Sequence, residues 1–487
     1  MFTQFYGLLW AEVMDPYKNE KIEVPPKQSG GFGQTEGYPI NLMATLGFVN
    51  IVVTPKVIDF GNQVVGCGSL PKTVKILNTG NAPLTLKDIS FYNCSPEMKA
   101  LGGLPPSNTL VQPGQSIELR LQFVPQDDTK EVCYLKITSN DLDEPVVYVK
   151  LQGKGVPTGT IVDKFNQVTG DKYDFLVVLD DCACTMVDYG SNIEAAMSSF
   201  VRNGAIWGKD FHVGIINMNI EDKSKRGKFN EHMKNVQPRY VQKSTPSAPD
   251  KFYNNYSEVA KESSSDSLTK GGLLAGYLAV TEPLQTFTNT PCQQDIDCLN
   301  NPNVCPDPAS CDMECVDGYC GGYNWGFIRD DAYLDMVFIS KADDQSPGPL
   351  SDYIDLMYSI KGRHNKPMTH FHCATWIDRC EGHAGHGPGD RYIALSKEFD
   401  GKQAIICDDF AWILNEVGSG LAPLKLQFFL SAQPVPPTSI QVKVNGQACT
   451  SGWQYEASSN SIVFDPTGPC MPQYSQPIEV TYTVGCQ

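Results

Sequence analysis

Six cysteines lie between positions 292 and 320, and this cluster constrains the fold more than any other feature of the sequence. Its members are Cys292, Cys298, Cys305, Cys311, Cys315 and Cys320. Zinc modules bind their metal through closely paired cysteines, whereas the intervals here vary and no CxxC pair occurs. The cluster therefore predicts a disulfide-linked segment made in an oxidising compartment. The whole chain has 17 cysteines, and because that number is odd, at least one thiol is expected to stay free or to pair with another chain.

Length and charge narrow the classes of function. A chain of 487 residues has room for about three or four domains. Its formal net charge of -17 repels phosphate backbones and anionic lipid, and no apolar stretch reaches the ~20 residues that span a bilayer. We therefore expect a protein or surface ligand as partner and association with other surface proteins, but neither nucleic acid nor membrane insertion. Residues 1–20 lack the features of a signal peptide, so the chain is expected to begin inside a longer protein or at a misplaced gene start.

Residues 49–156 alternate between apolar and polar side chains, as half-buried strands do. The alternating apolar positions are clearest at Ile117, Leu119, Leu121, Phe123, Val147, Val149 and Leu151. Turn-forming residues separate such runs, for example at Pro113-Gly114. Several short strands at this spacing predict a β-sandwich.

Short motifs in this region resemble the immunoglobulin-like domain of abnormal-spindle and hydin proteins, which bacterial surface proteins carry in tandem as the choice-of-anchor D module. The motifs are Thr54-Pro55, Asp59-Phe60-Gly61, Asn78-Thr79-Gly80, Pro83-Leu84, Pro113-Gly114, Phe123-Val124-Pro125, Ser139-Asn140-Asp141 and Leu151-Gln152-Gly153. The resemblance implies a spacer or interaction module without catalytic residues. Residues 38–47 echo the end of this module, so 1–48 is expected to be a linker or the remnant of a preceding β module. The alternative is an unrelated edge strand.

From residue 157 to 422 the pattern changes to alternating strands and helices, which predicts a doubly wound, Rossmann-like α/β domain. The expected strands are Phe175–Leu179, Val213–Met218, Met336–Ser340 and His370–Trp376, and the expected helices are Ser191–Val201, Gly271–Thr281 and Pro349–Lys361. The cysteine-rich stretch, 291–321, is expected to be an insertion on a loop. Residues 423–487 return to β alternation and predict a small C-terminal β domain or an extension of the α/β core.

The stretch Asp180-Asp181-Cys182-Ala183-Cys184-Thr185-Met186 follows the first of these strands. It resembles the metal-ion-dependent adhesion site of von Willebrand factor A domains, where D-x-S-x-S, a distant Thr and a distant Asp hold Mg²⁺ through oxygen ligands. Further motifs resemble a group of secreted myxobacterial A-domain proteins. They are Asp163-Lys164-Phe165-Asn166-Gln167, Asp344-Gln345-Ser346-Pro347, Arg391-Tyr392, Ile406-Cys407 and Phe428-Phe429-Leu430.

The resemblance implies a degenerate metal site. In the preferred register the ligands are Asp181, Thr185 and the distant Thr269, while Ala183 and Lys341 stand at the missing ligand positions. In the other register the motif starts at Asp180 and has Cys182 and Cys184 at both serine positions.

Alanine has no oxygen to offer and an ammonium repels a cation, so we expect no cofactor or only a weakly bound divalent cation, Mg²⁺ or Ca²⁺. Asp343 or Asp344 could restore coordination. We also hypothesise that the Lys341 ammonium replaces the metal beside Asp181. The alternative is that it points into water.

Two further features suggest chemistry. His370 and His372 share a face of a probable strand and could bind zinc, or they could line a loop near a Cys373–Cys380 disulfide. Since no nucleophile elbow or phosphate loop occurs, we do not expect an enzyme. The expected function is extracellular or cell-surface adhesion or ligand binding through the degenerate site. The alternative is a structural surface component in which the A domain is a metal-free scaffold.

Overall fold

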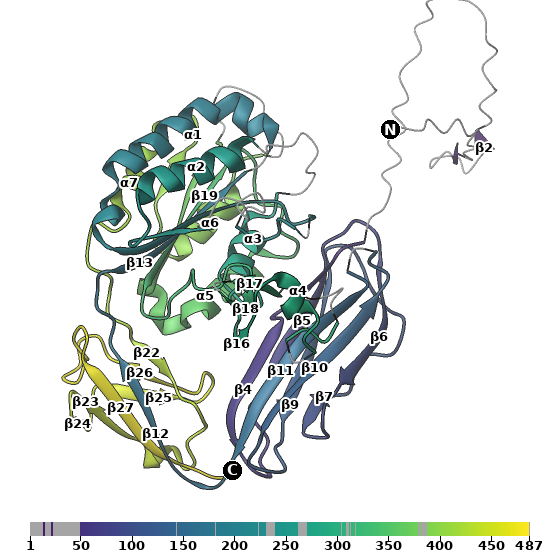
Figure 1. Ribbon diagram of the computed structural model, residues 1–487, viewed down its shortest axis with the longest axis vertical. Coiled ribbons are helices and arrows are strands. Elements are labelled where there is room, and N and C mark those ends of the chain that lie inside the picture. Colours follow the sequence, from purple (N-terminus) through teal and green to yellow (C-terminus); the bar gives the residue numbers. More distant parts are fainter. Residues whose placement is uncertain are drawn as a thin grey trace, which may run out of the picture. The chain divides into compact units, whose positions relative to one another are not determined.

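The computed structural model describes residues 49–486 with gaps at 143, 181, 223, 230–238, 262–269, 303, 308–310, 312, 317, 378–379 and 381–386, together with two short strands before them (Figure 1). The chain divides into the units Met1–Leu46 and Gly47–Gln487. In the first unit, β1 (Val13–Met14) pairs antiparallel with β2 (Lys21–Ile22). The module remnant expected at 38–47 lies outside the described residues.

Two sheets pack face to face between residues 51 and 156, with strand orders β4-β11-β10-β6-β8 and β3-β5-β9-β7. Their strands are β3 (Ile51–Thr54), β4 (Val57–Val64), β5 (Lys72–Asn78), β6 (Leu84–Tyr92), β7 (Met98–Leu101), β8 (Thr109–Val111), β9 (Ser116–Phe123), β10 (Lys130–Ser139) and β11 (Val146–Val156). Leu119, Leu121 and Val149 are buried in one shared core, as their alternation predicts. The disulfide Cys94–Cys133 staples β10 to the segment after β6.

A six-stranded sheet of order β15-β14-β13-β19-β20-β21 positions the candidate site. Its strands are β13 (Lys172–Leu179), β14 (Asp210–Asn217), β15 (Val241–Gln242), β19 (Tyr333–Ser340), β20 (Thr369–Thr375) and β21 (Gln403–Ile405). Neighbours are parallel except β15, which runs antiparallel to β14. The carboxyl ends of β13 and β19 therefore meet at one edge.

Helices pack against both faces of this sheet, so β13, β14 and β19 are buried along almost their whole length. One face shares its core with α1 (Ala183–Asn203), α2 (Ala248–Lys261) and α7 (Ala411–Glu416), and the other with α3 (Gly272–Ala279), α5 (Leu350–Lys361) and α6 (Asp390–Glu398). Short 3₁₀ helices are η1 (Ala205–Gly208), η4 (Arg363–Met368) and η5 (Pro437–Ser439). None of the helices in the described ranges is long and apolar enough to cross a membrane.

The predicted fold class is wrong. We expected an immunoglobulin-like sandwich followed by a doubly wound α/β domain, but the described part of the chain is β-rich, with strand in 37% and helix in 22% of the described residues. Its strands are spread over many small sheets, and the described part of the chain shows no clear doubly wound domain of the von Willebrand A type. The physical reason is that an apolar run such as Phe175–Leu179 indicates a strand buried on both faces, but not how that strand is connected or what joins its sheet.

The cysteine-rich stretch forms a small sheet of its own, of order β16-β18-β17. Its elements are β16 (Phe287–Pro291), α4 (Asp295–Leu299), β17 (Met313–Val316) and β18 (Tyr319–Gly322). The six cysteines pair as Cys292–Cys315, Cys298–Cys320 and Cys305–Cys311, which confirms the disulfide prediction.

The last part of the chain forms two further sheets around one core, of orders β12-β27-β23-β24 and β22-β26-β25. Their strands are β12 (Gly159–Asn166), β22 (Gln427–Phe429), β23 (Gln441–Val444), β24 (Gln447–Cys449), β25 (Trp453–Glu456), β26 (Ser461–Phe464) and β27 (Pro477–Val484). β12, which precedes the six-stranded sheet in the sequence, pairs with β27 along its whole length. The disulfide Cys449–Cys470 closes this region.

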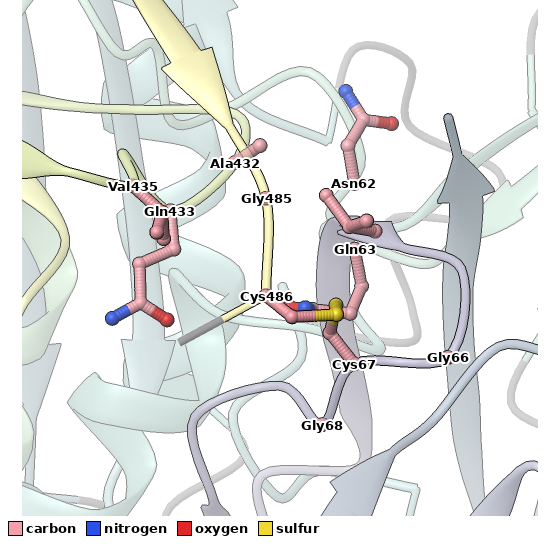
Figure 2. A pocket seen from close by; sticks show the side chains of 11 residues that line it. Asn62, Gln63, Gly66, Cys67, Gly68, Ala432, Gln433, Val435, Gly485 and Cys486 are labelled. Atoms are coloured by element: carbon pink, nitrogen blue, oxygen red, sulfur yellow. A yellow bond between two sulfur atoms is a disulfide. The ribbon is translucent and has the colours of Figure 1, made fainter. Parts of the chain in front are cut away.

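Two other findings concern cysteines. Cys67–Cys486 joins the loop after β4 to the end of the chain, beside a cavity of about 240 Å³ that Asn62, Gln433 and neighbouring backbone line (Figure 2). Cys373 is free and buried, which confirms that the odd count leaves one thiol. The suggested Cys373–Cys380 pair is wrong: Cys380 bonds Cys407, because the Cys373 side chain lies inside the core under β20 while Cys380 lies beyond the strand end.

Candidate functional site

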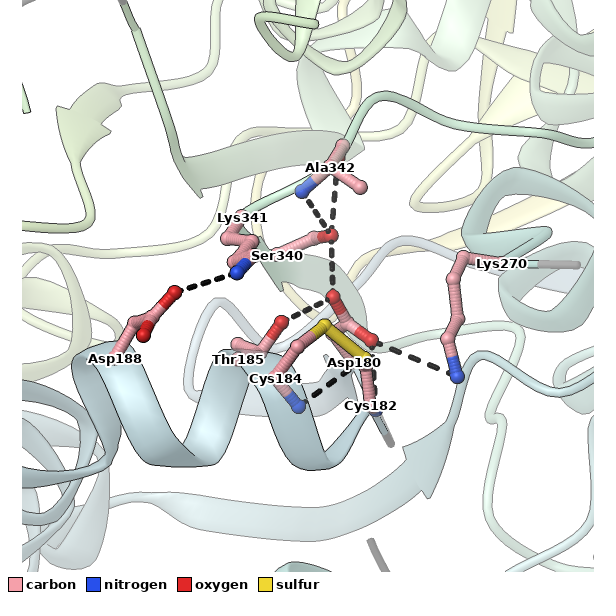
Figure 3. The surroundings of a disulfide bond; sticks show 9 residues. All are labelled: Asp180, Cys182, Cys184, Thr185, Asp188, Lys270, Ser340, Lys341 and Ala342. Atoms are coloured by element: carbon pink, nitrogen blue, oxygen red, sulfur yellow. Dashed lines mark hydrogen bonds and ion pairs between the residues drawn. A yellow bond between two sulfur atoms is a disulfide. The ribbon is translucent and has the colours of Figure 1, made fainter. Parts of the chain in front are cut away.

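The candidate site lies where β13 and β19 end, at the start of helix α1 (Figure 3). Asp180 follows β13 directly and is fully buried. A buried carboxylate must find hydrogen-bond donors or a cation, because leaving water otherwise costs it several kcal/mol. Its surroundings therefore reveal whether a metal ion is needed at this edge.

The protein itself satisfies the Asp180 carboxylate. Oδ1 accepts the backbone N–H of Cys182 at 2.9 Å, and Oδ2 accepts the hydroxyls of Thr185 at 2.7 Å and Ser340 at 2.9 Å. The ammonium of Lys270, itself buried, lies 3.8 Å from Oδ1. Three hydrogen bonds and one cation thus surround the charge that a metal would otherwise neutralise.

A second lysine stands at the same edge. The Lys341 ammonium, whose side chain is 8% exposed, lies 2.5 Å from Oδ2 of Asp188 on helix α1. Ala183 contributes no oxygen, and two ammonium groups repel a divalent cation. The described residues at this edge therefore do not fit Mg²⁺ or Ca²⁺, which require a shell of oxygen ligands.

The residues predicted for the site come together only in part. Thr185 and Lys341 lie at this edge, but Thr185 bonds Asp180 and Lys341 bonds Asp188. Asp181 and Thr269, the other predicted ligands, lie outside the described residues, and with them the hypothesised Lys341–Asp181 contact.

The acidic residues suggested as replacement ligands bond elsewhere. Asp344 is buried, accepts the Leu273 N–H at 3.0 Å and lies 3.2 Å from the Arg391 guanidinium. Burial raises the pKa of its carboxyl to about 6, although Arg391 opposes the shift. Asp343 accepts the backbone N–H of Arg391.

Sequence reasoning missed three features of the site, namely two side chains and one disulfide. Lys270 and Asp188 lie outside the adhesion motif, so no spacing drew attention to them. The third feature is a disulfide between Cys182 and Cys184, the two cysteines at the serine positions of the Asp180 register. Its signal in the sequence was the replacement of two hydroxyls by two sulfurs one residue apart.

The histidine pair lies at the opposite edge of the sheet, beside a cavity of about 250 Å³. His370, His372 and Asp335 bring their side chains together there. His372 Nε2 lies 2.9 Å from Asp335, while its Nδ1 accepts the backbone N–H of Lys402 at 2.9 Å. Because an N–H can only donate, the neutral ring carries its proton on Nε2 and donates it to Asp335.

That tautomer leaves His372 without a lone pair for a metal. His370 is bonded through Nδ1 to the Tyr333 hydroxyl, and burial lowers the pKa of its imidazole. His364 is separate and contacts Glu456, and His383 and His386 lie outside the described residues. The set fits a buried hydrogen-bond network rather than a zinc site.

Comparison with known proteins assigns no family: no family model and no curated protein matches the chain. Among solved structures, a Porphyromonas gingivalis W83 protein of unknown function is 24% identical over 22% of this chain and 46% of its own, with a TM-score of 0.18. The ASH/PapD-like domain of human CEP192 is 12% identical over 28% of this chain and all of its own, with a TM-score of 0.18. The Vibrio cholerae protease VesB is 11% identical over 22% of this chain and 31% of its own, with a TM-score of 0.19. The chain thus spans less than half of the Porphyromonas protein, and these similarities are too low to assign fold or function.

Proposed function

We propose that the chain is an extracellular or cell-surface component that binds a protein or surface ligand, and that its six-stranded sheet is a scaffold without a divalent cation. The observation that supports this is the surrounding of Asp180. Its carboxylate is held by Cys182, Thr185 and Ser340 and lies beside the Lys270 ammonium. Adhesion through a bridging metal would use these carboxylate and hydroxyl oxygens as ligands, but the Lys270 ammonium beside Asp180 repels a divalent cation there.

The cysteines support the proposal that the chain is located outside the cell or on its surface. Sixteen of the 17 form eight disulfides, a state that persists in oxidising environments and is rare where glutathione keeps thiols reduced. Several of these bridges hold small sheets whose own cores are limited, as in the 291–321 insertion. This favours a rigid surface component over a metal-switched adhesion domain.

Two measurements test the proposal. Calorimetric titration of the full chain with Mg²⁺ and with Ca²⁺ should give no saturable heat. Surface fractions of cells that produce the chain should retain it through a wash with EDTA. Tight Mg²⁺ binding that Asp180→Asn abolishes, release by EDTA, or recovery of the chain in a reducing cytoplasmic fraction would contradict the proposal.

A further inference from the structure

The Cys182–Cys184 disulfide contributes little as a staple. Its cysteines are separated by two positions in the sequence, whereas the other seven bridges span separations from 6 to 419. The chain entropy that a cross-link removes from the unfolded state grows with the length of the loop it closes. The Cys182–Cys184 bond is therefore expected to add little to the free energy of unfolding, and stability alone does not explain a disulfide at this position.

The backbone around the disulfide is held by hydrogen bonds of the Cys182 N–H and carbonyl groups, which do not depend on the bond between the two sulfur atoms. The Cys182 N–H donates to Asp180, and the Cys182 carbonyl accepts the N–H groups of Thr185 and Met186 at 3.0 and 3.2 Å. These contacts join the strand end to the first turn of α1. Figure 3 shows this turn with the disulfide at its start. Opening the disulfide would leave them in place, so the fold can accommodate both redox states.

The position also favours reaction with a thiol. Cys184 is exposed and Cys182 is half-buried, so an incoming sulfur can reach Cys184 more easily. Both lie at the N-terminus of the 21-residue helix α1, where Cys182 is the N-cap and its sulfur accepts the Cys184 N–H at 3.2 Å. The helix dipole and the Cys184 N–H that points at the Cys182 sulfur stabilise negative charge there, and a stabilised thiolate leaves faster.

We propose that Cys182–Cys184 is a redox-active disulfide that oxidises a dithiol of a partner protein by thiol–disulfide exchange. A partner thiolate attacks the Cys184 sulfur, the Cys182–Cys184 bond breaks, and Cys182 leaves as a thiolate. The second partner thiol, once deprotonated, attacks the partner's sulfur in the mixed disulfide and releases Cys184. The partner loses two electrons and two protons as its disulfide forms, and the protein gains both cysteines in reduced form. This inference does not depend on the proposed ligand-binding function.

The first test is selective reduction of the full chain. The protein is equilibrated in glutathione buffers of increasing reducing strength, alkylated with iodoacetamide, digested and analysed by mass spectrometry. We expect Cys182 and Cys184 to become labelled at a glutathione ratio that leaves the other seven disulfides intact. Cys67–Cys486 is the internal control, because Cys486 is also exposed but its bridge closes a loop of 419 positions. Reduction of the control before or together with Cys182–Cys184 would overturn the proposal.

The second test separates the roles of the two sulfurs. A synthetic peptide with two reduced cysteines should gain one disulfide per wild-type chain, and Cys184→Ser should abolish this oxidation. Offered oxidised glutathione, Cys182→Ser should form a mixed disulfide at Cys184 about tenfold faster than Cys184→Ser forms one at Cys182, because only Cys184 is exposed. No peptide oxidation by the wild type, or equal rates in the two variants, would overturn the proposal.

Discussion

Lys270 and Lys341 are both paired with a carboxylate at one edge of the sheet, but their partners differ in exposure. Asp180, which faces Lys270, is fully buried, whereas the Asp188 side chain opposite Lys341 is 36% exposed. Removing one member of a buried pair leaves an uncompensated charge, whereas water screens the member of an exposed pair that remains. At the scale of single residues, the positive charge that lies beside the buried carboxylate is therefore that of Lys270 and not that of Lys341.

This difference predicts unequal effects of two matched substitutions. Lys270→Met should lower the free energy of unfolding by about 3 kcal/mol, because it leaves the buried negative charge of Asp180 without a neighbouring cation. Lys341→Met should lower it by less than about 1 kcal/mol, since Asp188 can be hydrated. Urea denaturation of the oxidised variants measures both values. An equal loss, or a larger one for Lys341→Met, would show that the sequence-based hypothesis about Lys341 was closer to the truth.

At the scale of elements, the sequence predicts local conformation better than it predicts pairing. The alternation at Leu119 and Leu121 and the apolar run Phe175–Leu179 correctly indicate strands, because side-chain periodicity follows burial. No local signal pairs β12 with β27, whose residues lie more than 300 positions apart. Prediction of the candidate site from the sequence has the same limit. Thr185 could be found from a motif, whereas Lys270 comes near Asp180 only through the fold.

The amino ends of β13 and β14 carry two buried groups whose titrations oppose each other. Burial raises the pKa of Asp174 to about 6, although Arg329 opposes the shift, and burial lowers the pKa of His212 to about 4. The folded chain holds the Asp174 proton more tightly than the unfolded chain, so this group makes stability fall between about pH 4 and 6. The folded chain holds the His212 proton less tightly, so this group makes stability rise between about pH 4 and 6.5.

Because the two contributions offset each other, removing one should expose the other. His212→Gln keeps a donor for the Phe327 carbonyl, which His212 Nδ1 contacts at 2.8 Å, but removes the titrating ring. Relative to wild type, this variant should lose about 2–3 kcal/mol more unfolding free energy as the pH rises from 4 to 6.5. Urea midpoints at several pH values measure the slope. The same slope in both proteins would contradict the pKa shift of His212.

At the scale of the whole second unit, the sheet β3-β5-β9-β7 has two kinds of buried side chain. Ile76 of β5 points into the core between the two facing sheets, where it packs in one cluster with Leu86 of β6 from the other sheet. Val52 and Leu77 instead share a core with residues of the six-stranded sheet and its helices. The contact is reinforced by the buried ion pair of Arg226 with Glu144 at 2.8 Å. The facing sheets thus have a core of their own and a separate apolar surface that the rest of the unit covers.

That division predicts how residues 49–156 behave as an isolated fragment carrying Cys67→Ser, which removes the thiol that Cys486 would otherwise bond. The fragment should show a β circular-dichroism spectrum and a cooperative melt, because the core around Leu86 is complete within it. Leu86→Ala should lower its unfolding free energy by about 2–5 kcal/mol, whereas Leu77→Ala should change it by less than about 1 kcal/mol, since Leu77 is exposed once its partners are gone. In the full chain both substitutions should be destabilising. A disordered fragment, or equal losses from the two substitutions within it, would mean that the facing sheets need the rest of the unit to fold.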